Sequence, residues 1–211
     1  MNVIPTREEF YSALEQKHGK DIQQKFVEAK VAICGLGGLG SNIAIALARA
    51  GVGKLHLIDF DKVEISNLNR QQYNISQIGM DKTQALKENL QKIAPYVEIV
   101  VNTVRITQEN IAELFTDEQI ICEAFDRPEA KAMLVDGVLE NFPNKYLVAG
   151  SGMAGLDSAN EIKTKRITKR FFLCGDLTSD VDSGLGLYGA RVLACAAHQA
   201  TAILRIIAGK E

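Results

Sequence analysis

The 211-residue sequence lacks the features that mark several common classes of protein. Its four cysteines form no C-x-x-C pair, and zinc sites built from cysteine normally show such pairs. We therefore expect no structural zinc. The net charge of −2 provides no general basic surface for nucleic acid. No repeat, low-complexity tract or second domain is visible, and the length suits one α/β domain with a full core.

Targeting and membrane segments are also missing. The N-terminal stretch MNVIPTREEFYSALEQKHG has no apolar core of a secretory signal. The longest apolar stretch, near the C-terminus, is interrupted by Arg191, His198, Gln199 and Arg205, which makes it too broken for a membrane span. We expect a soluble, cytoplasmic protein with no membrane partner.

One local excess of positive charge lies between residues 163 and 170. It consists of Lys163, Lys165, Arg166, Lys169 and Arg170. The cluster could form a local binding patch, but charge runs of this kind usually belong to a solvated strand face.

The stretch from Val31 to Gln71 organises the rest of the sequence. Residues 31–34 are a short apolar run typical of a buried strand. The glycines that follow keep the G-x-G-x-x-G spacing: Gly35, Gly37 and Gly40. After an alanine-rich helical pattern, a second strand over 54–58 ends on Asp59, 19 residues after Gly40. The pattern predicts a βαβ unit whose first turn binds phosphates and whose Asp59 accepts hydrogen bonds from ribose hydroxyls.

Strand and helix patterns alternate along the remaining chain. Helices are expected over 6–29 with a break at Gly19, and over 81–93, 108–115, 128–139 and 187–208; strands are expected over 97–104, 120–125 and 146–149. This order predicts an α/β fold with a Rossmann-like, doubly wound, mainly parallel sheet and helices on both faces. Residues 159–173 change the pattern and predict an appended antiparallel strand or hairpin. The last helix is nearly apolar all round, so we expect it to be buried within the domain or at a subunit contact.

We divide this single domain into three parts. Residues 1–29 form N-terminal helices, and residues 30–155 form the nucleotide-binding core. Residues 156–211 contain the antiparallel strands, a flexible crossover segment over 178–186 and the C-terminal helix.

Loops that follow the strands bring several polar side chains to one edge of the predicted sheet, where open α/β sheets bind ligands. They are Asp59, Asn67, Arg70, Gln71, Lys82 and Asp126. Two cations suit a triphosphate, because they neutralise charge that builds on the phosphates in the transition state. A carboxylate near those phosphates suits Mg²⁺, which prefers oxygen ligands.

Each of these side chains also has an ordinary structural explanation. Asp59 could cap a turn, and Asp126 could cap the helix that begins at Pro128. Arg70 could be a surface ion-pair partner, and Lys82 could pair with an acid on its own helix. The residue pattern alone leaves these alternatives open.

The string GLGGLGSNIAIALARAGVGKLHLIDFDKVEISNLNRQ resembles the adenylation core of the ubiquitin-activating-enzyme-like superfamily, the adenylyltransferase group that includes ThiF and MoeB. The combination of G-x-G-G-x-G, D-x-D and S-N-L-x-R-Q is highly specific, and the match covers about residues 29–152. The overall size and the motifs FLCGD and AAHQA are most similar to a short form of ThiF. The resemblance implies ATP and Mg²⁺ as cofactors and a homodimer.

The resemblance also implies a role for each matching residue. The nucleotide loop would consist of Gly35, Gly37, Gly38 and Gly40. Asp59 would hold the ribose, with Asp61 in the same nucleotide-binding set. Contacts to the ATP phosphates would come from Asn67, Arg70 and Gln71. Arg70 would stabilise the transition state, Lys82 would neutralise the phosphates, and Asp126 would organise Mg²⁺ near the α-phosphate.

Three departures from the family pattern limit this transfer. The family's C-x-x-C zinc motifs are missing, so its zinc is not carried over. Its arginine-rich N-terminal motif is not recognisable; Arg7 is the candidate for an arginine reaching into a neighbouring subunit's site, and a solvated helix-start charge is the alternative. Cys174, in a polar turn where it could be exposed, is only roughly placed for the family's sulfur-linked cysteine. The other cysteines are expected to be buried and inert: Cys34, Cys122 and Cys195.

Together these features predict an ATP-dependent adenylyltransferase. The acceptor would be the C-terminal carboxylate of a small ubiquitin-like, ThiS-like sulfur carrier protein, giving an acyl adenylate and pyrophosphate in thiamine (thiazole) biosynthesis. Alternatives are MoeB-like activation of a molybdopterin-synthase carrier subunit, and a dinucleotide-dependent oxidoreductase or nucleotide sensor. The glycine fingerprint alone permits an oxidoreductase or a sensor, whereas the S-N-L-x-R-Q loop and the lack of a separate substrate domain argue against an oxidoreductase.

Overall fold

A computed structural model describes residues 4–180 and 184–211 of the chain. Its sheet has seven strands in the order β3-β2-β1-β4-β5-β7-β6. The strands are β1 (Lys30–Cys34), β2 (Lys54–Ile58), β3 (Glu98–Asn102), β4 (Ile120–Glu123), β5 (Tyr146–Gly150), β6 (Lys163–Arg166) and β7 (Phe171–Gly175). Every neighbouring pair is parallel except β6 with β7. The predicted doubly wound, mainly parallel sheet with an appended antiparallel strand is therefore confirmed.

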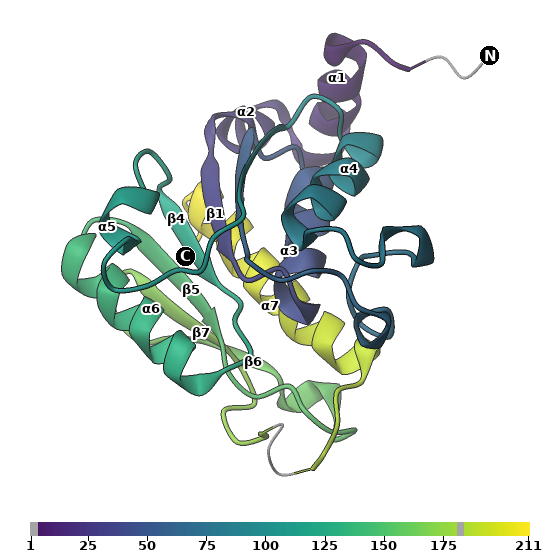
Figure 1. Cartoon of the computed structure of the whole chain (residues 1–211). Coiled ribbons are helices and arrows are strands. Elements are labelled where there is room, and N and C mark those ends of the chain that lie inside the picture. The colour runs from purple at the N-terminus through teal and green to yellow at the C-terminus, as the bar shows by residue number, and fades with distance from the viewer. Residues whose placement is uncertain (1–3, 181–183) are drawn as a thin grey trace.

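Helices cover both faces of the sheet (Figure 1). One side carries α1 (Arg7–His18), α2 (Lys20–Glu28), α3 (Gly38–Arg49), α4 (Lys82–Ile93) and α7 (Gly189–Ala208); the other carries α5 (Ile111–Leu114) and α6 (Pro128–Asn141). Three short 3₁₀ turns complete the described elements: η1 (Ile65–Asn67), η2 (Ile75–Gln77) and η3 (Ala159–Glu161). At the start of α1, Thr6 and Glu9 form a capping box, as the S/T-x-x-E spacing predicts.

Strand β1 shows why the central strands are apolar along their whole length. Val31 and Ile33 belong to the core beneath α3 and α7, whereas Ala32 and Cys34 belong to the core beneath α5 and α6. Successive side chains point to opposite faces of a strand, and both faces are covered here. The apolar run after residue 30 is therefore continuous rather than alternating.

The C-terminal part differs from the expectation in two respects. Strand β7 pairs antiparallel with β6 but also parallel with β5, so it extends the main sheet. Helix α7 is not buried all round: Cys195 and Ile203 are buried, whereas Leu193 and Arg205 are exposed. The expected crossover segment is described only in part, because residues 181–183 lie outside the described residues.

Among the described residues, α7 is the one helix long and apolar enough to cross a membrane by length and composition. Half of its apolar stretch is buried inside the molecule, where the helix packs against α3, β5 and β7. Core helices pass the same test, so this is weak evidence for a membrane span.

The strand order reverses between β1 and β4, which lie side by side at the centre of the sheet. At such a point the loops after the two strands diverge to opposite faces and leave a crevice. The loops that follow β1, β2, β4, β5 and β7 all leave from this same edge, because these strands are parallel. The topology therefore places a site beside the glycine loop.

A steric prediction tests how tightly α2 is packed against the turn before β2. A Cβ added at Gly53 would stand 1.8 Å from the backbone oxygen of Val27, whereas one added at Gly79 would meet no atom within 4 Å. We expect Gly53→Ala to lower the free energy of unfolding by about 3 kcal/mol. Gly79→Ala should cost only about 1 kcal/mol, through its positive φ. Urea unfolding of the two variants measures the difference, and equal losses would contradict this packing.

Candidate functional site

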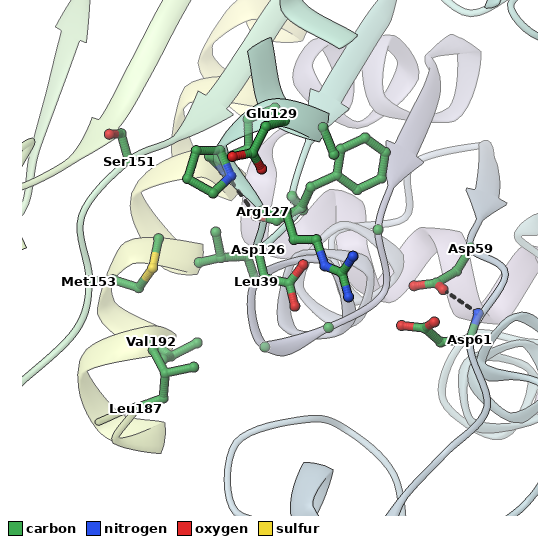
Figure 2. Close-up of a pocket in the computed structure, with 18 of the residues that line it drawn as sticks. Leu39, Asp59, Asp61, Asp126, Arg127, Glu129, Ser151, Met153, Leu187 and Val192 are labelled. Atoms are coloured by element: carbon green, nitrogen blue, oxygen red, sulfur yellow. Dashed lines mark hydrogen bonds between the residues drawn. The ribbon is translucent and has the colours of Figure 1, made fainter. Parts of the chain in front are cut away.

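A cavity of about 740 Å³ opens at the edge where the parallel strands end (Figure 2). Its walls come from the loops after β1, β2, β4, β5 and β7 and from the start of α4. Most residues of the predicted nucleotide set line it: Gly35, Gly37, Gly38, Asp59, Asp61, Arg70, Gln71, Lys82 and Asp126. The fold thus gathers in one place side chains that are separated by up to 91 residues in the sequence.

The glycine loop depends on close backbone contacts. Gly35 has φ +89°, and a Cβ there would stand 2.8 Å from the backbone oxygen of Ala124 in the neighbouring turn. Gly40 does not line the cavity; a Cβ there would stand 1.8 Å from the oxygen of Gly35. Its role is therefore to let the first turn of α3 pack against the loop, which is the usual function of the third glycine in this spacing.

Asp59 ties the loop after β2 to the glycine loop. Its carboxylate accepts hydrogen bonds from the backbone N–H of Leu36 at 2.6 Å and of Asp61 at 2.8 Å. Burial raises the pKa of Asp59, opposed by the nearby ammonium of Lys82 and by these two hydrogen bonds. The carboxylate therefore does cap a turn, but an ionised carboxylate has about four acceptor sites, so a further donor can still bind.

The two predicted cations occupy different surroundings. Lys82 is buried, and its ammonium lies 2.9 Å from Asp61, which belongs to the loop after β2. The alternative of a partner on its own helix is therefore wrong. Half-buried Arg70 donates to the backbone oxygen of Ser66 and to Oδ1 of Asn69, and it pairs with no carboxylate in the described part of the chain. The alternative of a surface ion pair is wrong for Arg70.

The side chain of Asp126 has no hydrogen-bond or ion-pair partner among the described residues, and neither does the side chain of Arg127, whose backbone oxygen accepts from the N–H of Lys131 at 3.0 Å. Helix α6 begins at Pro128 with Arg127 in the N-cap position and without a side-chain cap, so the capping alternative for Asp126 is wrong. Figure 2 shows Asp126 and Arg127 reaching into the cavity from the turn that leads into α6. An exposed carboxylate with no partner, facing a glycine loop, is free to bind a ligand.

The donor set at this turn fits Mg²⁺ shared with a nucleotide. No group of three or more His, Cys, Asp or Glu side chains that could hold a metal occurs in residues 4–180 and 184–211. Mg²⁺ is usually held by one or two carboxylates together with substrate phosphates rather than by a complete protein cage. Asp126 is available for such an arrangement.

Two further predicted residues, Asn67 and Arg7, do not line the cavity. The side chain of Asn67 accepts a hydrogen bond from the N–H of Glu64 at 2.9 Å, and its backbone oxygen accepts from Arg70 and Gln71. Asn67 therefore shapes the loop that carries Arg70. Arg7 lies at the opposite edge of the sheet, beside the starts of β1 and β2, with its guanidinium over the ring of Tyr11. Within one chain, Arg7 is thus on the far side of the sheet from the cavity.

Cys174 is placed differently from the expectation. It lies in β7 and is completely buried, so the expectation of an exposed polar turn is wrong. Burial raises the pKa of its thiol to about 11. The other cysteines are buried, as expected: Cys34, Cys122 and Cys195. Thiolates are the reactive form of cysteine, so the structure gives no support to a reactive thiol in this state of the chain.

The sequence patterns missed several residues that line the cavity: Phe60, Arg105, Arg127, Lys131, Ser151 and Thr178. Arg127 could have been found, because it follows Asp126 in the loop already selected. Arg105 had no such signal; it lies beyond β3 and stacks over Phe60 at 4.1 Å.

A buried ion pair that the sequence did not reveal holds the wall formed by the loops after β5 and β7. Arg191, near the start of α7, lies 2.6 Å from Asp176 and also donates to the backbone oxygen of Ala154. Asp176 also accepts from the N–H groups of Thr178 and Ser179. Although burial acts to raise the pKa of Asp176, these hydrogen bonds hold it well below its usual range. The pair joins the loops after β5 and β7.

The fold and cavity together define an α/β domain of the nucleotide-binding class, with a glycine loop at the point where the strand order reverses. Within that class, the chain belongs to the ThiF family, whose profile matches residues 11–211. The resemblance drawn from the sequence is thereby confirmed.

Two curated relatives illustrate the extent of the similarity. The chain is 33% identical over 131 residues to the sulfur carrier protein adenylyltransferase of Thermus thermophilus, covering 62% of this chain and 43% of the relative. It is 40% identical over 125 residues to ubiquitin-like modifier-activating enzyme 5 of Caenorhabditis elegans, covering 59% of this chain and 29% of the relative. The chain therefore spans less than half the length of these curated relatives.

Solved structures share the fold over nearly the whole chain. The E. coli tRNA N6-threonylcarbamoyladenosine dehydratase in complex with ATP has a TM-score of 0.87 at 22% identity, covering 99% of this chain and 98% of that one. E. coli MccB with ATP has a TM-score of 0.72 at 22% identity, covering 99% of this chain and 67% of that one. At these identities the likeness establishes the fold alone.

The burial of all four cysteines predicts slow thiol chemistry in the folded chain. Because the pKa of Cys174 is about 11, only about 1 in 10³ of its thiols would be ionised at pH 8 even without steric protection. We expect less than about half an equivalent of thiol to react rapidly with Ellman's reagent in the native protein. All four should react after unfolding in guanidinium. If one equivalent of thiol reacts rapidly in the native protein and this reaction is lost in Cys174→Ser, Cys174 is accessible and the prediction is wrong.

Proposed function

We propose that this chain is an ATP-dependent adenylyltransferase that activates the C-terminal carboxylate of a small ubiquitin-like sulfur carrier protein. The observation that carries the proposal is the unpartnered carboxylate of Asp126 in one cavity with the glycine loop and the cations Arg70 and Lys82. The name of the Thermus relative and the ATP in structures of the same fold support it. We propose that residues 1–211 act as one adenylation domain.

The proposed chemistry follows from the charges that line the cavity. The acceptor carboxylate attacks the α-phosphorus, a new C–O–P linkage forms, and the bond to the bridging oxygen of pyrophosphate breaks. No protein base is needed, because a carboxylate is already ionised near neutral pH. Arg70 and Lys82 would neutralise charge on the phosphates, and Asp126 would hold Mg²⁺, which supplies further neutralisation when bound.

The two halves of the cavity suit two ligands. Asp59, Asp61 and the glycine loop line one half, where the nucleotide would bind. Ser151, Met153, Leu187 and Val192 line the other half (Figure 2), which offers an apolar path for the acceptor's C-terminal tail.

The identity of the acceptor is a finer part of the proposal. We favour a ThiS-like carrier in thiamine biosynthesis, with a MoeB-like role as the alternative, and a cytoplasmic homodimer as the working form. Pyrophosphate exchange with a purified ThiS-like carrier and with a molybdopterin-synthase carrier subunit tests this directly. Exchange with neither carrier would contradict the proposal, and exchange with the second alone would favour the alternative.

Ligand-induced stabilisation separates this proposal from an oxidoreductase. Anything that binds the folded chain alone raises its melting temperature by mass action. ATP with Mg²⁺ should therefore raise it, whereas NAD(H) should leave it unchanged. The reverse result would favour a dinucleotide enzyme.

The role of Arg70 predicts a specific loss of rate. We expect Arg70→Ala to slow carrier-dependent pyrophosphate exchange by about 10²–10³-fold, as loss of an electrostatic contact to the transition state typically does. Lys92→Ala is the matched control, because Lys92 is an exposed cation in the last turn of α4 that does not line the cavity. Near-normal exchange by a folded Arg70→Ala variant would remove Arg70 from the proposed mechanism.

Asp126→Asn tests the carboxylate without changing its size. Because Asp126 caps no helix and has no protein partner in the described residues, the variant should melt within about 2 °C of the parent. It should still lose the proposed Mg²⁺ contact, so we expect exchange at least about 100-fold slower and a higher Mg²⁺ requirement. A Mg²⁺ titration of the exchange rate measures both effects, and normal turnover would place the metal elsewhere.

A further inference from the structure

A buried ion pair lies behind the turn that carries Asp126. The carboxylate of Glu123, at the end of β4, is fully buried, and the ammonium of Lys131 on α6 lies 3.0 Å from its Oε1 and 2.9 Å from its Oε2. The lysine side chain is 20% exposed and lines the cavity. None of the nucleotide-binding motifs accounts for either residue.

The pair binds both polar backbone groups of Phe125, the residue directly before Asp126. The N–H of Phe125 donates to Oε1 of Glu123 at 2.7 Å, and its carbonyl oxygen accepts from the ammonium of Lys131 at 2.9 Å. Helix α6 begins without a side-chain cap. The shape of this turn therefore depends on the ion pair rather than on a helix cap.

Two neighbouring elements fix the same turn from other sides. Gln199 of α7 donates to the backbone oxygen of Glu123 at 2.9 Å. A Cβ added at Gly35 would stand 2.8 Å from the oxygen of Ala124 and 2.9 Å from the ring of Phe125, so the glycine loop packs directly against this turn. The ion pair thus sets where Asp126 stands relative to the phosphate-binding backbone.

Stability is a poor explanation for such a pair. Burial raises the pKa of Glu123, opposed by Lys131, which means that burying the carboxylate is itself unfavourable. Replacing a buried ion pair by apolar side chains of similar size is often neutral or stabilising, whereas removing one partner leaves an uncompensated charge. A geometric role at the site explains the pair better.

We propose that Glu123 and Lys131 are positioning residues, which hold Asp126 at the phosphate end of the cavity through the backbone of Phe125. The inference rests on the proposed function, in which Asp126 holds Mg²⁺ beside ATP. It assigns the pair to metal-dependent nucleotide binding and to the rate of adenylation, not to the stability of the fold.

The decisive variant replaces both partners, Glu123→Leu with Lys131→Met, so that no unpaired charge is left in the core. We expect its melting temperature to stay within about 3 °C of the parent. Pyrophosphate exchange should fall by about 10–100-fold, because a small displacement of a catalytic group has effects of this size. The Mg²⁺ concentration for half-maximal rate should rise, while the KM for the carrier stays unchanged.

A second readout does not require turnover. ATP alone should raise the melting temperature of the parent and of the double variant equally. The additional rise on adding Mg²⁺ should be present in the parent and largely lost in the double variant. The single variant Lys131→Arg keeps the positive charge and the hydrogen-bond donors, so it should retain most of the Mg²⁺-dependent rise in melting temperature.

The control makes the same change in charge at an exposed ion pair near the opposite edge of the sheet, Lys30→Met with Asp117→Leu. Asp117 also pairs with Lys54 at 3.1 Å, and Lys54 keeps Glu98 as a second partner at 3.9 Å. The control variant should leave exchange and the Mg²⁺-dependent rise unchanged. The proposal is overturned if the Glu123/Lys131 double variant matches the parent in exchange and Mg²⁺ dependence, or if it melts far below the parent, which would make the pair structural. If the parent shows the Mg²⁺-dependent rise in melting temperature with ATP but catalyses exchange with no carrier, the proposed function is contradicted. Comparing that rise between the parent and the double variant would still test the role of the pair.

Discussion

The cavity depends first on the hydrogen bonds that fix the backbone of Leu36 in the glycine loop. Its N–H donates to the buried carboxylate of Asp59 at 2.6 Å, and its carbonyl oxygen accepts from the hydroxyl of Tyr73 at 2.8 Å. The loop is too irregular to satisfy these groups by helix or sheet pairing, and an unpaired buried backbone group is costly. Side chains from two other loops therefore determine its shape. The first N–H groups of α3, which begins at Gly38, have no partner within the helix and can face a ligand.

The turn before α6 is built in the same way, with Phe125 in the position of Leu36. A carboxylate binds the N–H of Phe125 and an ammonium binds its carbonyl oxygen. In both turns, burial raises the pKa of the carboxylate, Asp59 in one and Glu123 in the other, and a lysine opposes that rise. Two neighbouring turns are thus fixed by hydrogen bonds to buried side chains, whereas the side chains of Asp126 and Arg127, which follow Phe125, have no hydrogen-bond or ion-pair partner among the described residues. Rigid backbone around unpartnered polar side chains is the arrangement expected of a preorganised binding site.

The sequence predicts the parts of the site that local patterns specify, and it fails where distant segments meet. The unit from β1 to Asp59 could be predicted because the glycines, the helix and the second strand follow one another with fixed spacing. The surroundings of Cys174 could not, because β7 reaches the core by pairing with β5, and nothing near Cys174 in the sequence records that partner. The choice between a cap and a free carboxylate at Asp126 could not be predicted either, although Glu123 and Lys131 are close to it in the sequence. These two residues hold the turn in place of a helix cap, and they meet only because of how β4 packs against α6.

The half of the cavity proposed to take the acceptor is held by a separate interaction, which has a consequence for specificity. The Asp176–Arg191 pair joins the loops after β5 and β7, and it makes no contact with Asp59 or Asp126. The loops after β5 and β7 can therefore differ between relatives while the Asp59 and Asp126 turns keep their geometry, because separated sites with no shared partners change nearly independently. The residues that distinguish one acceptor from another should accordingly lie in the loops after β5 and β7, among side chains such as Met153 and Thr178, rather than around the glycine loop.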